Sequence, residues 1–379
     1  MNIYSNKDSI TNYISVLGNI SSKEDIEYLS SLLLKSDNLE MQITFLSAAM
    51  LPSQIVENLI WVQKNKKCKI YVLRRYLYSY LYSLGVNCLY IKSKSVESKA
   101  ILHNKVDNTE EINKDEVTIF LKEIYEKYRY NYTEYQLDSI IRRIKIGMLR
   151  ENTKKFQEFK EKVLNNSYIF EQIFLDFSIN TTEFFRNPNV FNTIRVKILP
   201  HLNAHSYIKI WCAGCSTGQE PYSLAIVLKE LGMLDKCQIY ATDINPYVIS
   251  EARNGIYPLQ SVEVAERNYK SSGGTESFTQ YFEVKDKYLK IKKDIKERIL
   301  FFDHSIIDNG VPGEFHLILC RNLFIYFNFQ LQEKMLKTFS KALDEKGFLV
   351  LGKSEGILLN NGSTYFDKYH EKHRIYIRR

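Results

Sequence analysis

The segment IKIWCAGCSTGQEPYS, residues 208–223, decides the fold of this chain. Its apolar start is typical of a short strand, the small residues that follow form a loop, and a helix is expected directly after the loop. Small side chains let the backbone approach a ligand closely, and the start of a helix supplies backbone N–H groups without partners. The segment therefore predicts a ligand site between a strand and a helix.

The composition of this loop narrows the class of ligand. It contains neither G-x-G-x-x-G nor the lysine of a P-loop, which argues against a dinucleotide or a nucleoside triphosphate. Glu220, at the expected helix start, disfavours phosphate and suits a ligand with ammonium or hydroxyl groups, such as S-adenosylmethionine. Cys212 and Cys215 form a C-x-x-C pair. Because no second pair lies nearby, we interpret them as small loop residues and expect no bound metal.

Strands and helices alternate after residue 207. Strands are expected at residues 207–212, 237–242, 299–302, 316–320 and 348–351, with helices between most of them. This order predicts an α/β fold with a mostly parallel, doubly wound sheet, whose ligands bind beyond the carboxyl ends of the strands. Residues 280–297 break the alternation, and we expect them to form a hairpin inserted into the sheet domain.

Polar residues follow two of these strands. Asp243 closes the second strand, roughly 20 residues after the loop, where such folds place an acid that binds ribose. The alternative is a helix cap. Arg321, Asn322 and Tyr326 follow the fourth strand and are expected at the same edge of the sheet.

The chain before residue 207 divides into further parts. Residues 1–95 are expected to form a separate α/β domain, with strands at 13–18, 41–46, 69–73 and 88–91 and helices at 23–34, from Ser53 to residue 63, and through residue 82. Residues 96–112 are interpreted as a linker, and apolar stripes at helical spacing predict a helical domain at 113–178. In that domain Arg142, Arg143 and Lys145 form either a solvated basic face or a surface that docks to an acidic helix.

The overall composition excludes several classes of protein. Of the 379 residues, 45% are hydrophobic and 25% are charged, as in globular proteins. We find no signal peptide and no apolar run of roughly 20 residues, and several cysteines lie in apolar strand contexts. We therefore expect a reduced, cytoplasmic protein without membrane insertion. The net charge of +8 favours an acidic partner, either nucleic acid or an acidic protein surface.

Five motifs in order resemble the CheR family of chemotaxis receptor glutamate methyltransferases, over residues 113–379. The motifs are residues 180–186 (NTTEFFR), 211–223, 241–244 (ATDI), 320–322 (CRN) with Tyr326, and 352–355 (GKSE). The resemblance implies a helical N-terminal domain followed by a Rossmann-like methyltransferase domain, here residues 179–379, that carries a β-subdomain at about residues 257–298.

The resemblance also assigns the site residue by residue. Arg186 and Tyr326 would lie nearest the transferred methyl group. The residues expected to contact S-adenosylmethionine, or its product S-adenosylhomocysteine, are Asn180, Thr182, Arg186, Gly214, Glu220, Asp243, Ser305, Ile306, Arg321 and Asn322. Ser305 and Ile306 stand where the family usually has Asn-Leu beside the adenine.

The implied activity is O-methyl ester formation on glutamate side chains of methyl-accepting chemotaxis receptors. Arg142, Arg143 and Lys145 would then dock to an acidic receptor helix. Some family members tether a receptor peptide through a glycine-containing loop in the β-subdomain, but the expected turn at Lys285-Asp286-Lys287 has no glycine, so we expect no tether. The alternatives are a catalytically silent cofactor-binding module in a signalling complex, or a nucleic-acid methyltransferase. Nucleic-acid methyltransferases usually carry an Asn/Asp-Pro-Pro-aromatic motif after the fourth strand, whereas this chain has Arg-Asn-Leu-Phe at residues 321–324, so we expect no nucleic-acid partner.

The N-terminal domain resembles the anti-sigma-factor antagonist (STAS) domain in the order of its elements. Such domains often carry a phosphorylatable serine near the start of the helix after the second strand, and Ser53 is the counterpart here. Residues 48–51 (AAML) replace the usual acidic and small-residue neighbourhood. The resemblance implies a regulatory domain with a protein partner, and the alternative is a small α/β interaction module.

Overall fold

The computed structural model describes residues 2–7, 11–17, 20, 23–34, 40–45, 51–72, 81, 86–90, 112–151, 153–167, 169–170, 182–285, 288–308, 310–311, 313–357 and 361–379. The chain forms two compact units, Met1–Asn108 and Thr109–Arg379. Each unit has its own hydrophobic core.

The first unit is built on a five-stranded sheet in the order β1-β2-β3-β4-β5. Its strands are Asn2–Lys7, Thr11–Leu17, Glu40–Phe45, Cys68–Val72 and Cys88–Tyr90. β1 is antiparallel to β2, whereas β2 to β5 are parallel neighbours in chain order. Alternate residues of β3, namely Met41, Ile43 and Phe45, are buried in one cluster with apolar residues of α1 (Lys23–Leu34) and α2 (Ser53–Asn65).

The elements expected in this unit lie within two residues of those observed, wherever the structure describes them. β1 was not expected. The helix expected from Ser53 to residue 63 is observed as α2, which begins at Ser53, and Pro52 holds the N-cap position with an extended backbone (φ −56°, ψ 146°). Most of the helix expected through residue 82 lies outside the described residues, as does the expected linker.

The second unit starts with three helices, α5 (Lys114–Tyr128), α6 (Leu137–Arg150) and α7 (Phe156–Asn165). The side chain of Asn113 caps α5 by accepting the Asp115 N–H at 2.8 Å. The apolar stripe of α5 is buried against that of α6, with Phe120 and Ile124 in one cluster with Ile140 and Ile144. Helical spacing alone therefore predicted these two faces.

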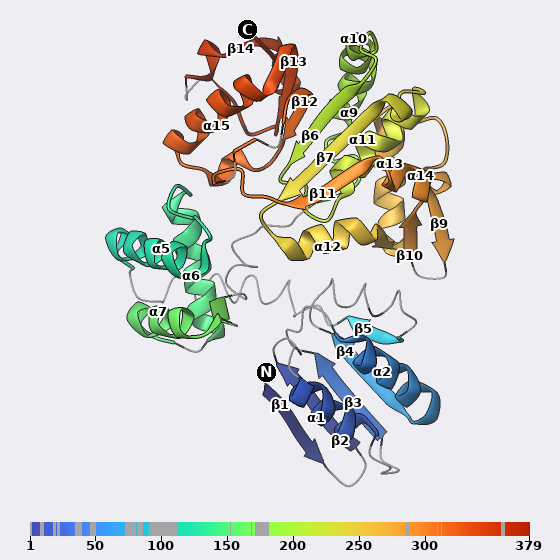
Figure 1. Cartoon of the computed structure of the whole chain (residues 1–379), viewed down its shortest axis with the longest axis vertical. Coiled ribbons are helices and arrows are strands. Elements are labelled where there is room, and N and C mark those ends of the chain that lie inside the picture. Colours follow the sequence, from blue (N-terminus) through green and yellow to red (C-terminus); the bar gives the residue numbers. More distant parts are fainter. Residues whose placement is uncertain are drawn as a thin grey trace. The chain divides into compact units, whose positions relative to one another are not determined.

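The rest of the second unit surrounds a seven-stranded sheet in the order β11-β7-β6-β12-β13-β15-β14 (Figure 1). Its strands are Ile299–Asp303, Cys237–Asp243, Ile208–Ala213, Phe315–Cys320, Leu343–Leu351, Ile375–Arg378 and Phe366–His370. The first five strands are parallel to one another. At the edge of the sheet, β15 is antiparallel to β13, and β14 is antiparallel to β15. The mostly parallel sheet is thus confirmed, while the two terminal antiparallel strands were not expected.

Helices cover both faces of this sheet, because inner strands such as β6 are apolar on both. Ile208 and Ile210 of β6 pack in one cluster with α11 (Gln219–Glu230), whereas Trp211 of β6 packs in another with α15 (Phe329–Ala342). The other helices of this part are α9 (Pro188–Thr193), its π-helical continuation η1 (Ile194–Ile198), α10 (Leu199–Leu202), α12 (Pro246–Asn254), α13 (Val262–Ser271) and α14 (Lys293–Lys296). Short 3-10 turns lie at Leu234–Lys236, Leu259–Ser261, Phe278–Tyr281, Phe324–Tyr326, Gly362–Thr364 and Glu371–His373.

A small antiparallel sheet lies beside the large one, in the order β8-β10-β9. The predicted hairpin is confirmed as β9 (Phe282–Lys285) paired with β10 (Tyr288–Ile291), and β8 (Ile256–Pro258) adds a third strand that was not expected. The turn residues Asp286 and Lys287 lie outside the described residues. Among the helices that the structure describes, none is long and apolar enough to cross a membrane.

Candidate functional site

The small-residue loop after β6 turns sharply at two glycines. Gly214 has φ 75°, and a Cβ there would lie 3.2 Å from Leu323 Cδ2. Gly218 has φ 92° and occupies the N-cap position of α11. Both positions favour glycine because other residues are strained at such φ values. The loop therefore leaves room at the carboxyl end of β6, where the sequence predicted a ligand.

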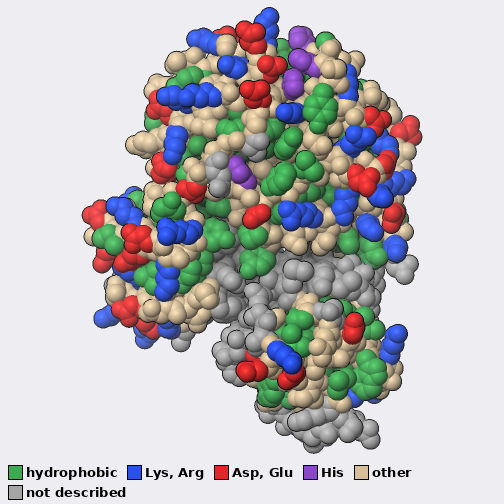
Figure 2. Space-filling model, in the orientation of Figure 1, with side chains coloured by type: hydrophobic (Ala, Val, Ile, Leu, Met, Phe, Trp, Pro, Cys, Tyr) green, Lys and Arg blue, Asp and Glu red, His purple; other side chains and the backbone are tan. Residues whose placement is uncertain are grey.

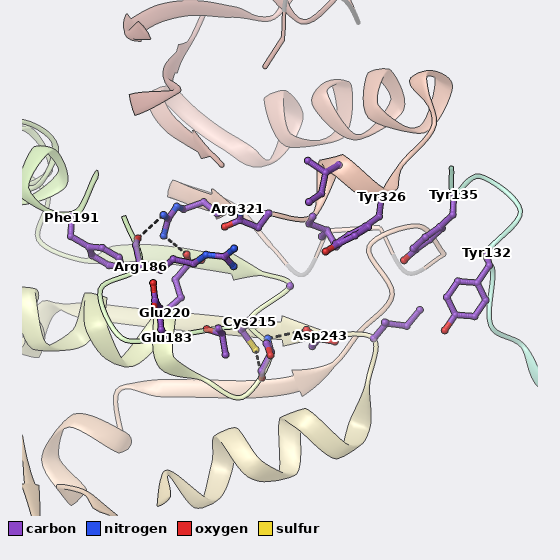
Figure 3. A pocket seen from close by; sticks show the side chains of 17 residues that line it. Tyr132, Tyr135, Glu183, Arg186, Phe191, Cys215, Glu220, Asp243, Arg321 and Tyr326 are labelled. Atoms are coloured by element: carbon purple, nitrogen blue, oxygen red, sulfur yellow. Dashed lines mark hydrogen bonds and ion pairs between the residues drawn. The ribbon is translucent and has the colours of Figure 1, made fainter. Parts of the chain in front are cut away.

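A cavity of about 1120 Å³, open to solvent, lies over this loop (Figure 3). It is lined from the carboxyl ends of β6, β7 and β12, from the segment before α9, and from the segment between α5 and α6. Of the residues expected at the site, the cavity brings together Thr182, Arg186, Gly214, Glu220, Asp243, Arg321, Asn322 and Tyr326. Asn180 lies outside the described residues.

Asp243 is held firmly at the end of β7. Its Oδ2 accepts the Ser216 N–H at 2.9 Å, and its Oδ1 accepts the Asn245 N–H at 3.0 Å. Burial raises the pKa of Asp243, although the backbone N–H groups of Asn245 and Ser216 act against that rise. Each oxygen keeps a second lone pair, so the carboxylate can also accept the hydroxyls of a ribose.

Glu220 and Arg321 are bound to each other. Arg321 Nη1 lies 2.6 Å from Glu220 Oε2, and only 1% of the Arg321 side chain is exposed. Arg321 Nη2 also donates to the Arg186 carbonyl at 2.8 Å and to Asn187 Oδ1 at 3.0 Å. Arg321 therefore anchors the segment that carries Arg186, in addition to lining the cavity. This internal role was not part of the sequence prediction.

The buried carboxylate of Glu355 fixes the segment that follows β12. Glu355 is 4% exposed and accepts backbone N–H groups from Asn322 at 3.0 Å, from Ile325 at 3.3 Å, and from Gly352. Asn322 has φ 60°, a strained value for a residue with a side chain. The glutamate of the GKSE motif thus does not line the larger cavity itself, but it orders the segment from Asn322 to Tyr326, which does.

Tyr326 faces the cavity beside Arg186 (Figure 3). Its carbonyl accepts the Gln136 N–H at 2.8 Å. The Arg143 guanidinium lies 5.3 Å from the centre of its ring. Burial raises the pKa of Tyr326, so its hydroxyl stays protonated near neutral pH and can donate a hydrogen bond.

The prediction of a docking surface is wrong for Arg143, which is only 7% exposed. Helical periodicity placed it away from the apolar stripe of α6, but that side of the helix is covered by Tyr326. Arg142 is exposed and Lys145 is half-buried, so both remain accessible from solvent.

A smaller cavity of about 370 Å³ adjoins the first and shares Gly214, Asp243, Ile244, Tyr135 and Leu323 with it. Ser305 and Ile306, expected beside the adenine, line this second cavity together with His304. Burial lowers the pKa of His304, so the imidazole is neutral at pH 7, and its buried Nδ1 has no hydrogen-bond partner. The two cavities thus separate the expected adenine contacts from Arg186 and Tyr326, with Asp243 between them.

Two of the lining residues that the sequence reasoning missed, Tyr132 and Tyr135, belong to the helical part of the chain. They lie in a tyrosine-rich run, residues 128–135 (YRYNYTEY), between α5 and α6. The high density of tyrosines in this run could have indicated residues of a ligand site.

Cys212 and Cys215 are buried, and burial raises the pKa of both thiols well above the ordinary range. Both therefore stay protonated, in line with their interpretation as small loop residues.

Comparison with known proteins identifies the fold around this site. Residues 180–375 match the family described as CheR methyltransferase, SAM binding domain. The chain belongs to this family. Cher3 of Pseudomonas putida is 37% identical over 269 residues, which cover 71% of this chain and 98% of that relative. The chemotaxis protein methyltransferase of Borreliella burgdorferi is 32% identical over 69% of this chain and 95% of its own length. That of Listeria innocua is 28% identical over 60% of this chain and 84% of its own length.

Membership in the CheR family confirms the predicted S-adenosylmethionine cofactor and the Rossmann-like methyltransferase fold. The residues present fit that cofactor. Gly214 lines the larger cavity without a side chain to fill it, and the Asp243 carboxylate can accept ribose hydroxyls. The hydroxyl of Ser216, which lines the larger cavity, is buried without a hydrogen-bond partner. A buried polar atom of this kind is stabilised when a ligand supplies the missing bond.

Proposed function

We propose that the chain transfers the methyl group of S-adenosylmethionine to glutamate side chains of chemotaxis receptors, as O-methyl esters. The observation that carries this proposal is the pair Arg186 and Tyr326 at the wall of the cofactor cavity (Figure 3). A guanidinium and a protonated phenol are both hydrogen-bond donors, and together they suit an incoming carboxylate. The names of the relatives from Borreliella burgdorferi and Listeria innocua support chemotaxis as the setting.

The chemistry needs little from the protein beyond positioning. S-adenosylmethionine, when bound, supplies an electrophilic methyl group. A glutamate acceptor is already ionised at neutral pH, so no base must remove a proton from it. Among the described residues that line the larger cavity there is no lysine or histidine. Arg186 and Tyr326 would hold the carboxylate in line with the transferred methyl group. Alignment of two reacting groups lowers the activation free energy of a reaction by several kcal/mol, and by about 7–11 kcal/mol in the best cases.

Docking of the receptor would use the exposed side of α6. Arg142 and Lys145 remain on that side, and the family's receptor helices are rich in acid. On the face shown in Figure 2, the helical part at the left carries acidic and basic side chains close together rather than a field of one sign. We therefore propose a local contact through these two residues, without Arg143.

The first unit would regulate this activity. Its strands β2 to β5 are parallel neighbours in chain order, with α1 and α2 packed on one face, which supports the resemblance to a STAS domain. We propose that it binds a protein partner and that Ser53, at the start of α2, is its phosphorylation site. Mass spectrometry of the protein purified from its native cells tests this, and an unmodified Ser53 under all growth conditions would count against it.

Methyl transfer from radiolabelled S-adenosylmethionine to a purified receptor fragment tests the proposed function. We expect label in the receptor that is released as volatile methanol by mild base, since methyl esters are base-labile. Replacing the acceptor glutamates of the receptor by alanine should remove the signal. Tight cofactor binding with no transfer to any receptor would instead support the catalytically silent module.

A further inference from the structure

We propose that the first unit binds a second copy of this chain through the outer surface of α1 and α2, and that a two-fold axis relates the two copies. The inference names a protein partner for the first unit, and it depends neither on the methyl acceptor nor on the cofactor. Because it concerns the first unit alone, its failure would leave the proposed methyl transfer unaffected.

The helices α1 and α2 lie side by side on one face of the five-stranded sheet. Each connects two neighbouring parallel strands, β2 to β3 and β3 to β4, so both helices run from the carboxyl edge of the sheet back to its amino edge. The side chain of Asn58 on α2 donates a hydrogen bond to the Ser30 hydroxyl of α1 at 2.9 Å. The outer sides of the two helices therefore form one continuous surface.

This surface exposes large apolar side chains. Tyr28 of α1 is 50% exposed, Leu34 of α1 is 42% exposed, and Trp61 of α2 is 45% exposed. Leu34 lies one turn beyond Ser30, and Trp61 lies one turn beyond Asn58, so the two side chains are at the same level of the parallel helices. A single exposed apolar residue needs no explanation, but grouped apolar residues that include aromatic rings indicate a protein contact.

The charges on this surface are separated between the two helices. The start of α1 is acidic, with Glu24 and Glu27 exposed, and the last turn of α1 has no basic residue. The end of α2 is basic, because Lys64 is exposed in its last turn and Lys66 follows, with Nζ 6.0 Å from the centre of the Trp61 ring. Since α1 begins at the carboxyl edge and α2 ends at the amino edge, the acidic and the basic ends lie at diagonally opposite corners.

Two such surfaces are complementary to each other. A second copy can pack face to face about a two-fold axis that lies in the interface, so that the acidic start of its α1 meets the basic end of α2 in the first copy. The reverse contact then occurs as well. Lys23 and Glu57 are exposed exceptions to this separation of charge. Any other occupant would need its own matching pattern, whereas a second copy supplies the pattern by symmetry.

The size of the surface predicts a weak dimer. α1 has 12 residues and α2 has 13, so each helix is about 20 Å long, and the pair covers about 20 by 20 Å. Such a contact buries on the order of 1,000 Å² over both copies, below the range of about 1,200–2,000 Å² that is typical of stable interfaces. We therefore expect a monomer–dimer equilibrium in the micromolar range. Salt should weaken it, because the charged groups are exposed.

Sedimentation of the full chain over a range of concentrations tests the dimer. The unmodified protein should change from monomer to dimer as its concentration rises. Trp61→Ala should raise the dissociation constant about tenfold or more, since aromatic residues inside an interface contribute much of its binding energy. The control is Leu89→Ala, which should dimerise normally. Leu89 is 57% exposed on β5 and points away from the helices, because its neighbour Cys88 is buried on their side.

A monomer at every concentration would overturn the proposal and leave the surface to a different protein. An equal loss of dimer in the variants at Trp61 and Leu89 would overturn it as well, because the contact would then not be specific to the helices.

Reversal of charge tests the arrangement of the two copies. The double variant Glu24→Lys, Glu27→Lys has basic residues at both ends of the surface. The double variant Lys64→Glu, Lys66→Glu has acidic residues at both ends. Each variant alone should remain monomeric, because like charges would meet twice in its dimer. An equimolar mixture should form dimers again, since both contacts then join opposite charges.

The control for these variants is Lys69→Glu, which changes an exposed lysine of β4 on the sheet face away from the helices and should dimerise normally. Normal dimers of either double variant alone, or a mixture that stays monomeric, would contradict the arrangement.

Tryptophan fluorescence of the unmodified protein keeps the test valid if a variant fails to fold. The chain contains two tryptophans, Trp61 and Trp211, and Trp211 is fully buried in the second unit. Dilution of the dimer should therefore shift the emission to longer wavelength as Trp61 becomes exposed to water, over the same concentrations as the change in sedimentation. Dissociation without this shift would show that Trp61 lies outside the interface and would overturn the proposal.

Discussion

Replacing Glu355 by alanine should destabilise the second unit and disorder the segment that carries Tyr326. The carboxylate is 4% exposed and accepts three backbone N–H groups, from Asn322, Ile325 and Gly352. Hydrogen bonds to charged groups contribute about 1.5–3 kcal/mol each, and buried donors left without an acceptor cost about 1–3 kcal/mol each. Burial raises the pKa of Glu355, which shows that desolvation of the carboxylate offsets part of this gain.

The net loss in Glu355→Ala should be about 3 kcal/mol of unfolding free energy. For a domain of this size, that corresponds to a decrease in melting temperature of about 6–12 °C. Glu355→Gln keeps one acceptor oxygen and should lose about 1 kcal/mol. Because Glu355 orders the residues up to Tyr326, the glutamine variant should also lose turnover while it remains folded.

The loss of stability is measured by calorimetric melting with and without S-adenosylhomocysteine. The loss of turnover is measured by receptor methylation at a temperature where all variants are folded. The matched control is Glu371→Gln, a surface glutamate directly after β14 whose ion pair with Lys368 is exposed. If Glu355→Ala melts within about 2 °C of this control, the three hydrogen bonds do not stabilise the segment, and the argument is wrong.

Three further predictions concern the cavity and its rim. Asp243→Ala should weaken S-adenosylhomocysteine binding at least tenfold by calorimetry. Because burial raises the pKa of Asp243, the affinity should fall as the pH decreases, and the fall should begin at a higher pH than the ordinary pKa of an aspartate would give. Asp243→Asn should remove this dependence, and a pH-independent affinity in the unmodified protein would contradict it. Tyr326→Phe should lower kcat for receptor methylation more than it lowers cofactor affinity, whereas equal losses would assign Tyr326 a binding role. Reversing the charges of Arg142 and Lys145 to glutamate should raise KM for the receptor and leave cofactor affinity unchanged, and normal receptor kinetics would leave these residues as a solvated face.

The sheet and its ligand edge could be predicted because their signals are local. The apolar run 208–213, the small loop after it and the polar ends of β7 and β12 each occupy a few consecutive residues. A parallel order then brings the carboxyl ends together without further information. The unexpected strands β1, β8, β14 and β15 carry weaker local signals and are defined by the neighbours with which they pair.

The remaining site features depend on contacts between distant parts of the chain. Glu355 is more than 30 residues from Asn322, and Arg321 is about 100 residues from its partner Glu220. Periodicity placed Arg143 outside the apolar stripe of α6, but it could not show that Tyr326 covers that side. Tyr135 enters the site for the same reason, since its bridge partner Phe327 lies almost 200 residues away.

A crystal structure of the full chain with S-adenosylhomocysteine tests the central claim most directly. We predict the ribose at the Asp243 carboxylate, the adenine beside Ser305 and Ile306, and the sulfur facing Arg186 and Tyr326 with space left for a carboxylate. A ligand bound elsewhere, or a sulfur turned away from Arg186 and Tyr326 with the space before it filled by protein, would contradict the account.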